Sequence, residues 1–578
     1  MTFSLRYLYS LPFLALVWLT VPNNHDLSVS DRMQTMPDDL PGKALFKTHC
    51  VSCHALEQDG IGPKLGGITR LLSENELIAF MKNPQKAIES GNTRAVSLSK
   101  RYKMIMPGFD FLKDDELKSI VAYIADETRK NNSQPLAVSN NTSGATTRLT
   151  EPVAQSNLTI ELEEFMTIPP SSDKMPRTRI ATMRAHPSGD GTQFVSDQRG
   201  LIYRIAGKEV STFLDVRPLI ENFINEPGLG TGLGSFAFHP DFLKNGLIYT
   251  THTESFKGKR ADYSYSDSVE VALQWVVSEW HMDDLTTPVF TGKRRGLLRV
   301  NMPSSAHGVQ DIGFNPEALK GSQDYGKLYI GIGDGGSTIN KHPELCHKLT
   351  SLLGTLIRID PLGRNSKNGQ YGIPDDNPFV ADKDAGVYKE IYAYGFRNPH
   401  RQAWYNGRLL CTDVGESNFE EVNVIQKGGD YGWNVREGNF GISSKDLKNV
   451  YPVPDTKSDK FIRPLLQYDH IDGNAISGGY VYEGPIEALK HKYVFGDIAR
   501  GRVFFANIDK NLTDHSVQEL TIMQDGKPTN LVELSGSKRV DLRITYNRFT
   551  KEMYIMTKSD GKIRRIKKAG YQQAKMDR

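Results

Sequence analysis

Cysteine is scarce in this sequence, and so is any excess of charge. Four cysteines among 578 residues are too few for a disulfide scaffold. Lys and Arg total 71 against 68 Asp and Glu, and the basic residues are scattered, which argues against nucleic acid as a partner. Apolar residues reach 38%, enough for a sizeable core, so global disorder and a polytopic membrane protein are both excluded. At about 100–200 residues per domain, the length predicts more than one domain.

Long apolar runs are also missing, except at the N-terminus. Residues 1–21 begin with a lone cation, Arg6, continue through the run from Leu11 to Val21, and break at Pro22. This pattern is typical of a secretory signal, although the run is short for a membrane span. No small-x-small cleavage site is obvious, so a cleaved signal and an uncleaved membrane anchor both remain open. In either case we expect an exported protein, in the periplasm or otherwise outside the cytoplasm.

The chain divides at a polar segment. Between residues 131 and 157 apolar periodicity disappears and Asn, Ser and Thr make up about half of the residues, which predicts a flexible linker. Upstream, residues 40–128 predict a small all-α domain. Ser73 and Glu76 form a capping box. Residues 114–127 place their apolar side chains on one helical face.

Downstream, residues 160–570 show short strand-like runs. A unit of strand, turn and second strand, often ending in an acidic residue, recurs six times. The turns lie at His186-Pro187, His239-Pro240, Asn315-Pro316, Asn406-Gly407, Glu483-Gly484 and Tyr546-Asn547. The repeat predicts an all-β six-bladed β-propeller, with a pair of large β-sandwiches as the alternative.

The helical region carries a haem-attachment motif. Cys50, Cys53 and His54 form C-x-x-C-H, in which the two thiols bond covalently to haem c and the histidine ligates the iron. A zinc or thioredoxin-type site would need a second ligand pair or a βαβ context, and neither is present. The sixth ligand should be a soft donor further along the domain, which leaves Met104 and Met106.

This region resembles a class I cytochrome c. Gly62-Pro63 resembles the family's loop whose carbonyl orients the ligand histidine, and Met106-Pro107-Gly108 resembles its axial methionine turn. The resemblance implies Met106 as the sixth ligand. The alternative is Met106 as a core side chain, with the iron open or ligated by a histidine.

No G-x-G-x-x-G follows a strand and opens a helix, so a Rossmann-type flavin or nicotinamide site is not expected. Residues from about 175 to 568 instead resemble the glucose/sorbosone dehydrogenase family. The stretches that carry the resemblance include AHGVQDIGFNPE, KLYIGIGDGG, YAYGFRNPHRQAW and DVGESNFEEVNVIQKGGDYGW. The family consists of six-bladed propellers that use pyrroloquinoline quinone (PQQ) and calcium, which implies the same fold and cofactors here.

The resemblance also implies roles for individual residues. His307 falls where the family's general base stands, and its imidazole suits that task. Arg397 and Asn398 match residues that contact the quinone, and the aromatic Tyr468 lies in another cofactor-binding stretch. The resemblance also implies a catalytic role for Arg397, whose guanidinium can bind carboxylates and stabilise negative charge on the reduced cofactor. The alternatives are a structural loop histidine at 307, and an ion pair or a turn at 397 and 398.

The metal ligands follow from the same resemblance. Gly415 and Glu416 sit where backbone carbonyls hold the catalytic calcium. Glu421 and Tyr431 match the region of a structural calcium. The GDGG run at 333–336 is a further candidate loop site, although a strand-end turn is the plainer interpretation.

The chain departs from the family's best-studied branch at three positions. A cofactor-contacting Lys is Ala499, a Gln is Gly230, and an aromatic residue after Tyr468 is Ile471. Arg500 and Arg539 are candidates to replace the lost cation.

Two cysteines remain, Cys346 and Cys411. They either form a disulfide or stay as two buried thiols.

The leading hypothesis is therefore an exported quinohaemoprotein dehydrogenase. It would oxidise a sugar, another alcohol or an aldehyde at the propeller and pass electrons to its own haem c. From there they would go to an external acceptor such as another cytochrome or a terminal oxidase. The alternative is a non-catalytic propeller that binds a ligand or a protein, fused to an electron-relay cytochrome.

Overall fold

The computed structural model describes most of the chain after the first 40 residues. The described residues are 41–51, 54–57, 62–102, 106, 108–137, 148–173, 175–226, 230–443, 447, 449–454, 460–508 and 516–572, without the side chains of 47, 48 and 100. The predicted export signal, Cys53 and Met104 lie outside them. Among the described residues, no helix is both long and apolar enough to cross a membrane.

The N-terminal domain is all-helical, as predicted. Its elements are α1 (Pro41–His49), η2 (Ile68–Arg70), α2 (Glu74–Lys82), α3 (Pro84–Glu89), α4 (Thr93–Tyr102) and α5 (Asp114–Lys130). The predicted capping box at α2 is confirmed, because Glu76 N donates to Ser73 Oγ at 3.3 Å and Ser73 N donates to Glu76 Oε2 at 2.8 Å.

Helix α5 organises the core of this domain. Its predicted apolar face is buried at Leu117, Ile120, Val121 and Ile124. Helix α1 crosses α5 closely at Gly42, where a Cβ atom would lie 1.8 Å from the backbone oxygen of Ser119. Only glycine permits this approach, which brings the start of the haem motif against α5.

The second domain is built from four-stranded antiparallel sheets. Three of its blades are β2 (Ile180–Ala185), β3 (Gln193–Asp197), β4 (Leu201–Ala206) and β5 (Glu209–Asp215); β6 (Leu233–Phe238), β7 (Leu247–Ser255), β8 (Leu273–Met282) and β9 (Gly292–Met302); and β10 (Asp311–Phe314), β11 (Leu328–Ile332), β12 (Thr355–Ile359) and β13 (Ile391–Tyr394). The fourth is β14 (Pro399–Tyr405), β15 (Arg408–Asp413), β16 (Phe419–Val424) and β20 (Leu466–Asp469). A small sheet of β17 (Arg436–Glu437), β18 (Phe440–Ile442) and β19 (Val450–Pro452) is inserted before β20.

The last two blades share one continuous sheet. The fifth is β21 (Ile476–Val481), β22 (Lys492–Asp497), β23 (Val503–Asn507) and β24 (Gln518–Gln524), with β25 (Lys527–Thr529) paired to β24. The sixth is β26 (Leu542–Asn547), β27 (Glu552–Thr557), β28 (Lys562–Tyr571) and β1 (Ala154–Thr167). Short helices α6 (Phe242–Asn245), η3 (Pro343–Leu345), η4 (Glu487–Leu489) and α7 (Leu531–Ser535) lie in connections. Within the described residues these sheets make six blades, which confirms the predicted propeller.

The six turns found in the sequence occupy equivalent places in the blades. Five of them follow the first strand of a blade and lead into the second strand, and the sixth, Tyr546-Asn547, forms the end of the first strand β26. The first strands β2, β6, β10, β14, β21 and β26 contact one another around a closed ring, so they line the propeller axis.

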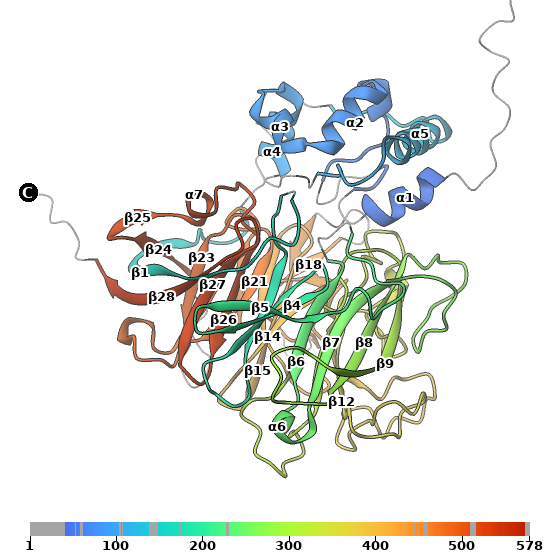
Figure 1. Cartoon of the computed structure of the whole chain (residues 1–578). Coiled ribbons are helices and arrows are strands. Elements are labelled where there is room, and N and C mark those ends of the chain that lie inside the picture. The colour runs from blue at the N-terminus through green and yellow to red at the C-terminus, as the bar shows by residue number, and fades with distance from the viewer. Residues whose placement is uncertain are drawn as a thin grey trace, which may run out of the picture. The chain divides into compact units, whose positions relative to one another are not determined.

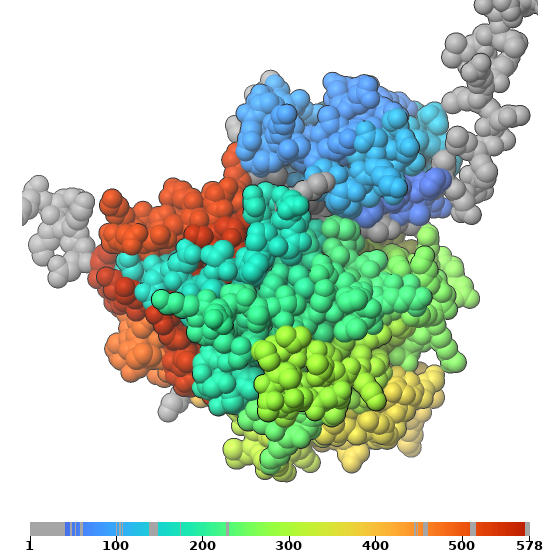
Figure 2. Space-filling model, in the orientation of Figure 1, coloured from blue at the N-terminus to red at the C-terminus, as the bar shows by residue number. Residues whose placement is uncertain are grey.

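The ring is closed by the first strand of the domain. β1 pairs antiparallel with β28 and parallel with β24. Figure 1 shows β1 beside these C-terminal strands, and Figure 2 shows its teal surface among their red surface. β1 begins at Ala154, inside the segment 131–157 predicted as linker. The preceding residues are already ordered, because Arg148 pairs with Asp472 at 2.6 Å.

Asp311 links blades at the axis. Its Oδ1 accepts Nη2–H of Arg184 at 3.0 Å and the hydroxyl of Ser235 at 2.9 Å, and its Oδ2 accepts the backbone N–H of Gln402 at 3.0 Å. These partners stand on β2, β6 and β14, so one buried carboxylate on β10 joins four blades.

We predict that Asp311→Ala destabilises the propeller by about 3 kcal/mol, because it leaves two buried donors and the partly exposed guanidinium of Arg184 without their acceptor. The urea midpoint followed by tryptophan fluorescence measures this. The control Asp215→Ala removes a half-exposed pair with Arg217 and should cost less than about 1 kcal/mol. Equal losses in the two variants would contradict the role of Asp311.

Candidate functional site

The haem motif is followed by a loop that orients its histidine. His54 Nδ1 lies 2.7 Å from the carbonyl oxygen of Pro63, so this nitrogen carries the proton and Nε2 is the nitrogen that would ligate a metal. Gly62 packs against the same ring, where a Cβ atom would lie 2.4 Å from His54 Cε1. The Gly62-Pro63 pair therefore does what the cytochrome resemblance implied.

The proposed haem ligands share a cavity wall. In this domain the residues that line a cavity include Cys50, His54, Gly62, Pro63, Leu65, Ile68, Phe80, Met81, Leu98, Met106 and Phe109. Met106 also packs on the apolar core. His54 and Met106 are thus brought to one apolar cavity, which suits a haem, whereas Cys53 and Met104 fall outside the described residues.

The propeller has a hollow near its axis, called here the propeller hollow. Its walls are formed by Gly230, Ser305, Ala306, His307, Gln310, Asn398, His400, Val414, Ala475, Ile498, Arg539, Asp541, Arg543 and Lys558. The predicted residues His307 and Asn398 both belong to it, as does Arg539, one of the two candidates for the missing cation.

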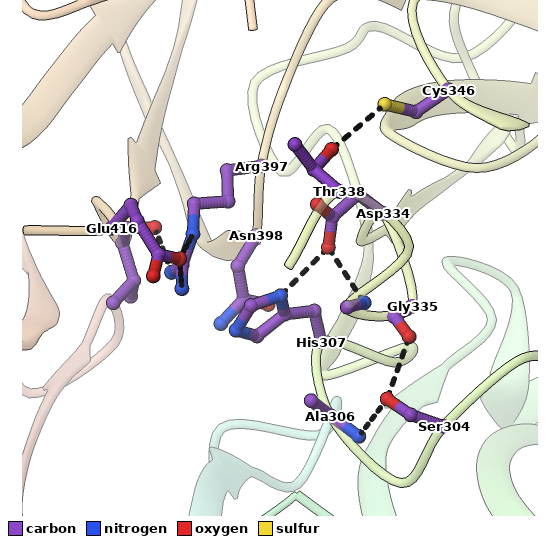
Figure 3. A network of polar contacts seen from close by, with 12 residues as sticks. Ser304, Ala306, His307, Asp334, Gly335, Thr338, Cys346, Arg397, Asn398 and Glu416 are labelled. Atoms are coloured by element: carbon purple, nitrogen blue, oxygen red, sulfur yellow. Dashed lines mark hydrogen bonds and ion pairs between the residues drawn. The ribbon is translucent and has the colours of Figure 1, made fainter. Parts of the chain in front are cut away.

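His307 is held by a buried carboxylate. Its Nδ1 lies 2.7 Å from Oδ1 of Asp334, whose side chain is only 1% exposed (Figure 3). The same carboxylate accepts the backbone N–H of Gly336 at 2.8 Å and the indole Nε1–H of Trp433 at 2.9 Å. Burial raises the pKa of Asp334, but the charge and hydrogen bond of His307, with Arg397, leave it below its ordinary value.

An ionised Asp334 can only accept hydrogen bonds, so His307 must carry its proton on Nδ1. In the neutral imidazole Nε2 then holds a lone pair. This is the arrangement of a general base.

The loop geometry explains the glycines around His307. Its φ of 45° is unusual for a side-chain-bearing residue. A Cβ on Gly333 would lie 2.2 Å from His307 O, and one on Gly308 would lie 1.8 Å from Trp275 Nε1. The GDGG run therefore serves to bring Asp334 against His307, which sequence reasoning missed. The one sequence signal for this role was that an acidic residue, Asp334, follows the end of strand β11.

Two polar side chains of the hollow lack partners. Asn398 Oδ1 and His400 Nδ1 are buried without a hydrogen bond to any described group. Burial, and then the charges of Arg401, Arg543 and Lys558, hold the pKa of His400 well below its ordinary value. Orphaned buried polar atoms of this kind indicate a site for a polar ligand.

Arg397 is engaged elsewhere. Its Nε donates to Glu416 Oε2 at 2.9 Å, its Nη2 donates to the same oxygen, and its Nη1 donates to Val414 O at 2.8 Å. The guanidinium also lies over the ring of Trp433. In Figure 3 it points toward Glu416, and it is not among the residues lining the hollow. The structure therefore agrees with the alternative interpretation, in which Arg397 forms a structural ion pair.

The predicted catalytic calcium loop has its amides turned inward. The backbone N–H groups of Glu416, Ser417 and Asn418 donate to Glu437 Oε1 at 2.8, 2.8 and 2.9 Å. In a planar trans peptide the carbonyl opposes the N–H. The carbonyls of Gly415 and Glu416 therefore point away from Glu437, as cation ligands at this loop require.

Glu421 faces a second buried carboxylate. It lies opposite Asp413 in the β15–β16 ladder. Burial, with the neighbouring carboxylates, raises the pKa of Glu421 to about 7, and burial and Glu421 raise the pKa of Asp413 well above its ordinary value. The hydroxyl of Tyr431 donates to Val424 O and accepts the backbone N–H of Gln426. A metal at Tyr431 would therefore be bound by its backbone carbonyl.

No cluster of three or more His, Cys, Asp or Glu residues suited to a metal occurs in the described part of the chain. A calcium ion would depend on backbone oxygens and a bound cofactor.

Other predicted residues lie away from the hollow. Tyr468 is buried against Phe495 and Phe504 in the core. Arg500 donates to Ile471 O at 2.7 Å and His470 O at 3.1 Å. Neither lines the hollow, and neither do Ala499 and Ile471, whereas Gly230 does. The structure thus does not bring Tyr468 and Arg500 to the expected cofactor site.

The remaining cysteines do not form a disulfide. Cys346 and Cys411 are both buried thiols without a disulfide partner. Burial raises the pKa of Cys346 to about 12 and that of Cys411 well above its ordinary value, so both stay protonated. The second alternative, two buried thiols, is confirmed.

Fold and site together define a class: a β-propeller protein with a c-type cytochrome domain ahead of it. Residues 181–527 match the family described as Glucose / Sorbosone dehydrogenase, and residues 40–127 match Cytochrome c. The chain belongs to the glucose/sorbosone dehydrogenase family and carries an N-terminal cytochrome c domain.

Individual relatives are distant. HIPL1 protein from Arabidopsis thaliana is 28% identical, over 57% of this chain and 53% of its own length. Hedgehog-interacting protein from Homo sapiens is 28% identical over 54% of this chain and 40% of its own. Aldose sugar dehydrogenase YliI from Escherichia coli is 34% identical over 42% of this chain and 57% of its own. The chain spans about half the length of the curated relatives it matches.

Among solved structures, a crystal structure of a glucose dehydrogenase aligns with a TM-score of 0.51 at 17% identity, over 70% of this chain and 99% of that chain. This likeness concerns the fold alone.

We predict that Gly62→Ala disturbs the haem site, because the added methyl would overlap the His54 ring. The expected result is a lower haem content and an altered visible spectrum of the oxidised protein. The control is Gly91→Ala, at φ 78°, which strains the backbone while its added methyl has open space around it and does not overlap the His54 ring. An unchanged spectrum in Gly62→Ala would contradict the assignment.

Proposed function

We propose that this protein is a quinohaemoprotein dehydrogenase that oxidises a sugar or another alcohol in the propeller hollow. The observation that carries the proposal is the pair of His307 and buried Asp334, which leaves a basic nitrogen in a hollow with unpaired polar groups. The likeness of part of the chain to an aldose sugar dehydrogenase supports the substrate class.

His307 would take the hydroxyl proton of the substrate on Nε2. Asp334 holds the opposite nitrogen, fixes the tautomer and stabilises the positive charge that the ring gains. Trp433 and Gly336 hold the two oxygens of Asp334 in turn, so the carboxylate cannot rotate away. The substrate carbon would give up a hydride to a two-electron acceptor as the proton leaves, which would give a carbonyl product.

The residues present fit PQQ with calcium. When bound, the quinone supplies a two-electron acceptor for the hydride. Asn398 and the cationic groups of the hollow would hold it, and the outward carbonyls of Gly415 and Glu416 would hold the calcium. Arg397 would act as a positioning residue, since it fixes Val414 and Glu416 on either side of Gly415. Asp413 and Glu421, which lie opposite each other in the β15–β16 ladder, would be the place for a second cation.

The cytochrome domain explains how electrons would leave. When bound, haem c carries one electron at a time, and His54 with Met106 would ligate its iron. Two electrons from each substrate would pass singly to an external acceptor such as another cytochrome or a terminal oxidase. Because of the N-terminal sequence pattern, we propose that the protein is exported to the periplasm, and that it is tethered to the membrane if the signal is not cleaved.

A second candidate is a propeller that binds a ligand or a protein without chemistry. Two observations favour it. The chain is similar over 54% of its length to Hedgehog-interacting protein, whose name denotes protein binding, and Arg397 is bound by Glu416 instead of lining the hollow.

We predict that purified, oxidised protein supplied with calcium and PQQ reduces its haem when given members of a panel of aldoses and alcohols. His307→Ala should lower the rate at least about 100-fold, within the range that general bases contribute. Chemical reduction of the haem by dithionite should stay intact. The absorbance of the haem measures both.

If no substrate of the panel drives reduction of the haem, the dehydrogenase is excluded and the second candidate remains. Full turnover in His307→Ala would instead contradict the assignment of the base.

We predict that Trp433→Phe lowers kcat/KM about 10- to 100-fold, because a hydrogen bond to a charged group is worth about 1.5–3 kcal/mol. It should also shift the pH profile, which a merely structural role would not do. Trp404→Phe is the control, since this half-buried indole packs on Tyr329 outside the hollow. A Trp433→Phe profile that coincides with the control would disprove the coupling through Asp334.

A further inference from the structure

The ends of the second strands repeat a common device. Asp197 accepts the backbone N–H of Arg179 at 2.9 Å. Asp413 accepts those of Arg397 at 2.9 Å and Asn398 at 2.5 Å. Asp497 accepts those of Asn474 at 2.7 Å and Ala475 at 3.0 Å. In each of these blades a buried carboxylate thus holds the backbone that enters the first strand.

Blade six places a cation at the same position. After the second strand, the run Lys558-Ser-Asp-Gly561 takes the place of Asp197-Gln-Arg-Gly200 in blade one. Lys558 is only 3% exposed and lines the propeller hollow. Its Nζ donates to Gln198 Oε1 at 2.6 Å, and it forms no ion pair with any described residue. A buried ammonium without an anion is costly to keep.

Arg543 stands on the same wall in a similar state. It is 4% exposed, its Nη1 donates only to Leu542 O at 2.7 Å, and its Nε has no partner among the described groups. Burial and then Arg401 lower its pKa to about 9, and burial and then Arg543 lower the pKa of Lys558 well below its ordinary value. The charge of Arg543 therefore adds to the cost of charging Lys558.

The walls of the hollow do not balance this charge. Their cations are Arg539, Arg543 and Lys558, and their one carboxylate is Asp541, so three positive groups face one negative group. Asp541 Oδ1 already accepts from Arg539 Nε at 3.0 Å. His400 adds an unpaired ring nitrogen but no charge. The hollow therefore has more buried hydrogen-bond donors than acceptors, and a bound anion would accept hydrogen bonds from the surplus donors.

We propose that Lys558 and Arg543, with His400 beside them, form a subsite that binds a carboxylate group of a ligand in the propeller hollow. The subsite rests on the proposed function for the identity of that ligand. The carboxylate belongs either to the quinone cofactor, which bears three, or to an acidic sugar substrate. Lys558 supplies a point charge, and Arg543 supplies a planar donor pair.

Equilibrium dialysis of the full-length haem protein, stripped of cofactor by a chelator, tests the subsite. The probes are PQQ with calcium and its trimethyl ester, which lacks the three negative charges. Lys558→Gln should weaken binding of the quinone about tenfold or more and leave the ester unaffected, and Lys558→Arg should restore most of the affinity. The control is Lys562→Gln, on the same blade, whose side chain is partly exposed and pairs with Glu164.

The substrate arm compares glucuronate with glucose. A rise in KM for glucuronate alone in Lys558→Gln, with quinone affinity unchanged, would support the subsite and assign it to the substrate. Equal loss of quinone and ester, or no change with any probe, would overturn it.

Failure of the proposed function has a separate signature. If the wild type binds no quinone and reduces no haem, the thermal midpoint in citrate still decides the matter. A rise in the wild type that Lys558→Gln lacks would support the subsite, and no rise would overturn it.

Discussion

A buried carboxylate must find hydrogen-bond donors, and this requirement shapes the propeller. In blades one, four and five the donors are the backbone amides that enter the first strand, so the carboxylate holds each blade's entry in place. In blade three the corresponding carboxylate, Asp334, is instead paired with His307. A repeated structural device has become part of a site because a different donor reaches it.

The folded chain also carries charge that it does not neutralise. Cations gather at Arg543 and Lys558, and carboxylates face one another at Asp413 and Glu421. Each set is buried, and burial shifts the pKa values of Arg543 and Glu421 toward the neutral form. An anion and a cation bound at these places would relieve both costs and stabilise the fold in proportion to their affinity.

Local patterns in the sequence were enough for much of the architecture. The six turns, the capping box at Ser73 and the loop at Gly62-Pro63 each depend on residues close in the chain. The partner of His307 could not be found in this way, because Asp334 lies 27 residues away and meets it only through the folding of blade three.

Side-chain direction was the other limit. Tyr468 stands on β20, the fourth strand of its blade, so it packs into the core and cannot reach the axis. Arg500 and Arg539 both lie in loops between strands, yet only Arg539 lines the hollow. Lys558 and Arg543 went unnoticed because a basic residue at the end of a strand or on its exposed-looking face usually meets water.

The strand that closes the ring has a consequence for how the molecule is made. β1 is synthesised directly after the polar segment, but its partners β24 and β28 belong to the last two blades of the chain to be made. A newly made β1 therefore has an unpaired edge until nearly the whole propeller exists. The helical domain can fold and receive its haem early, whereas the ring can close only after synthesis of the chain is almost complete.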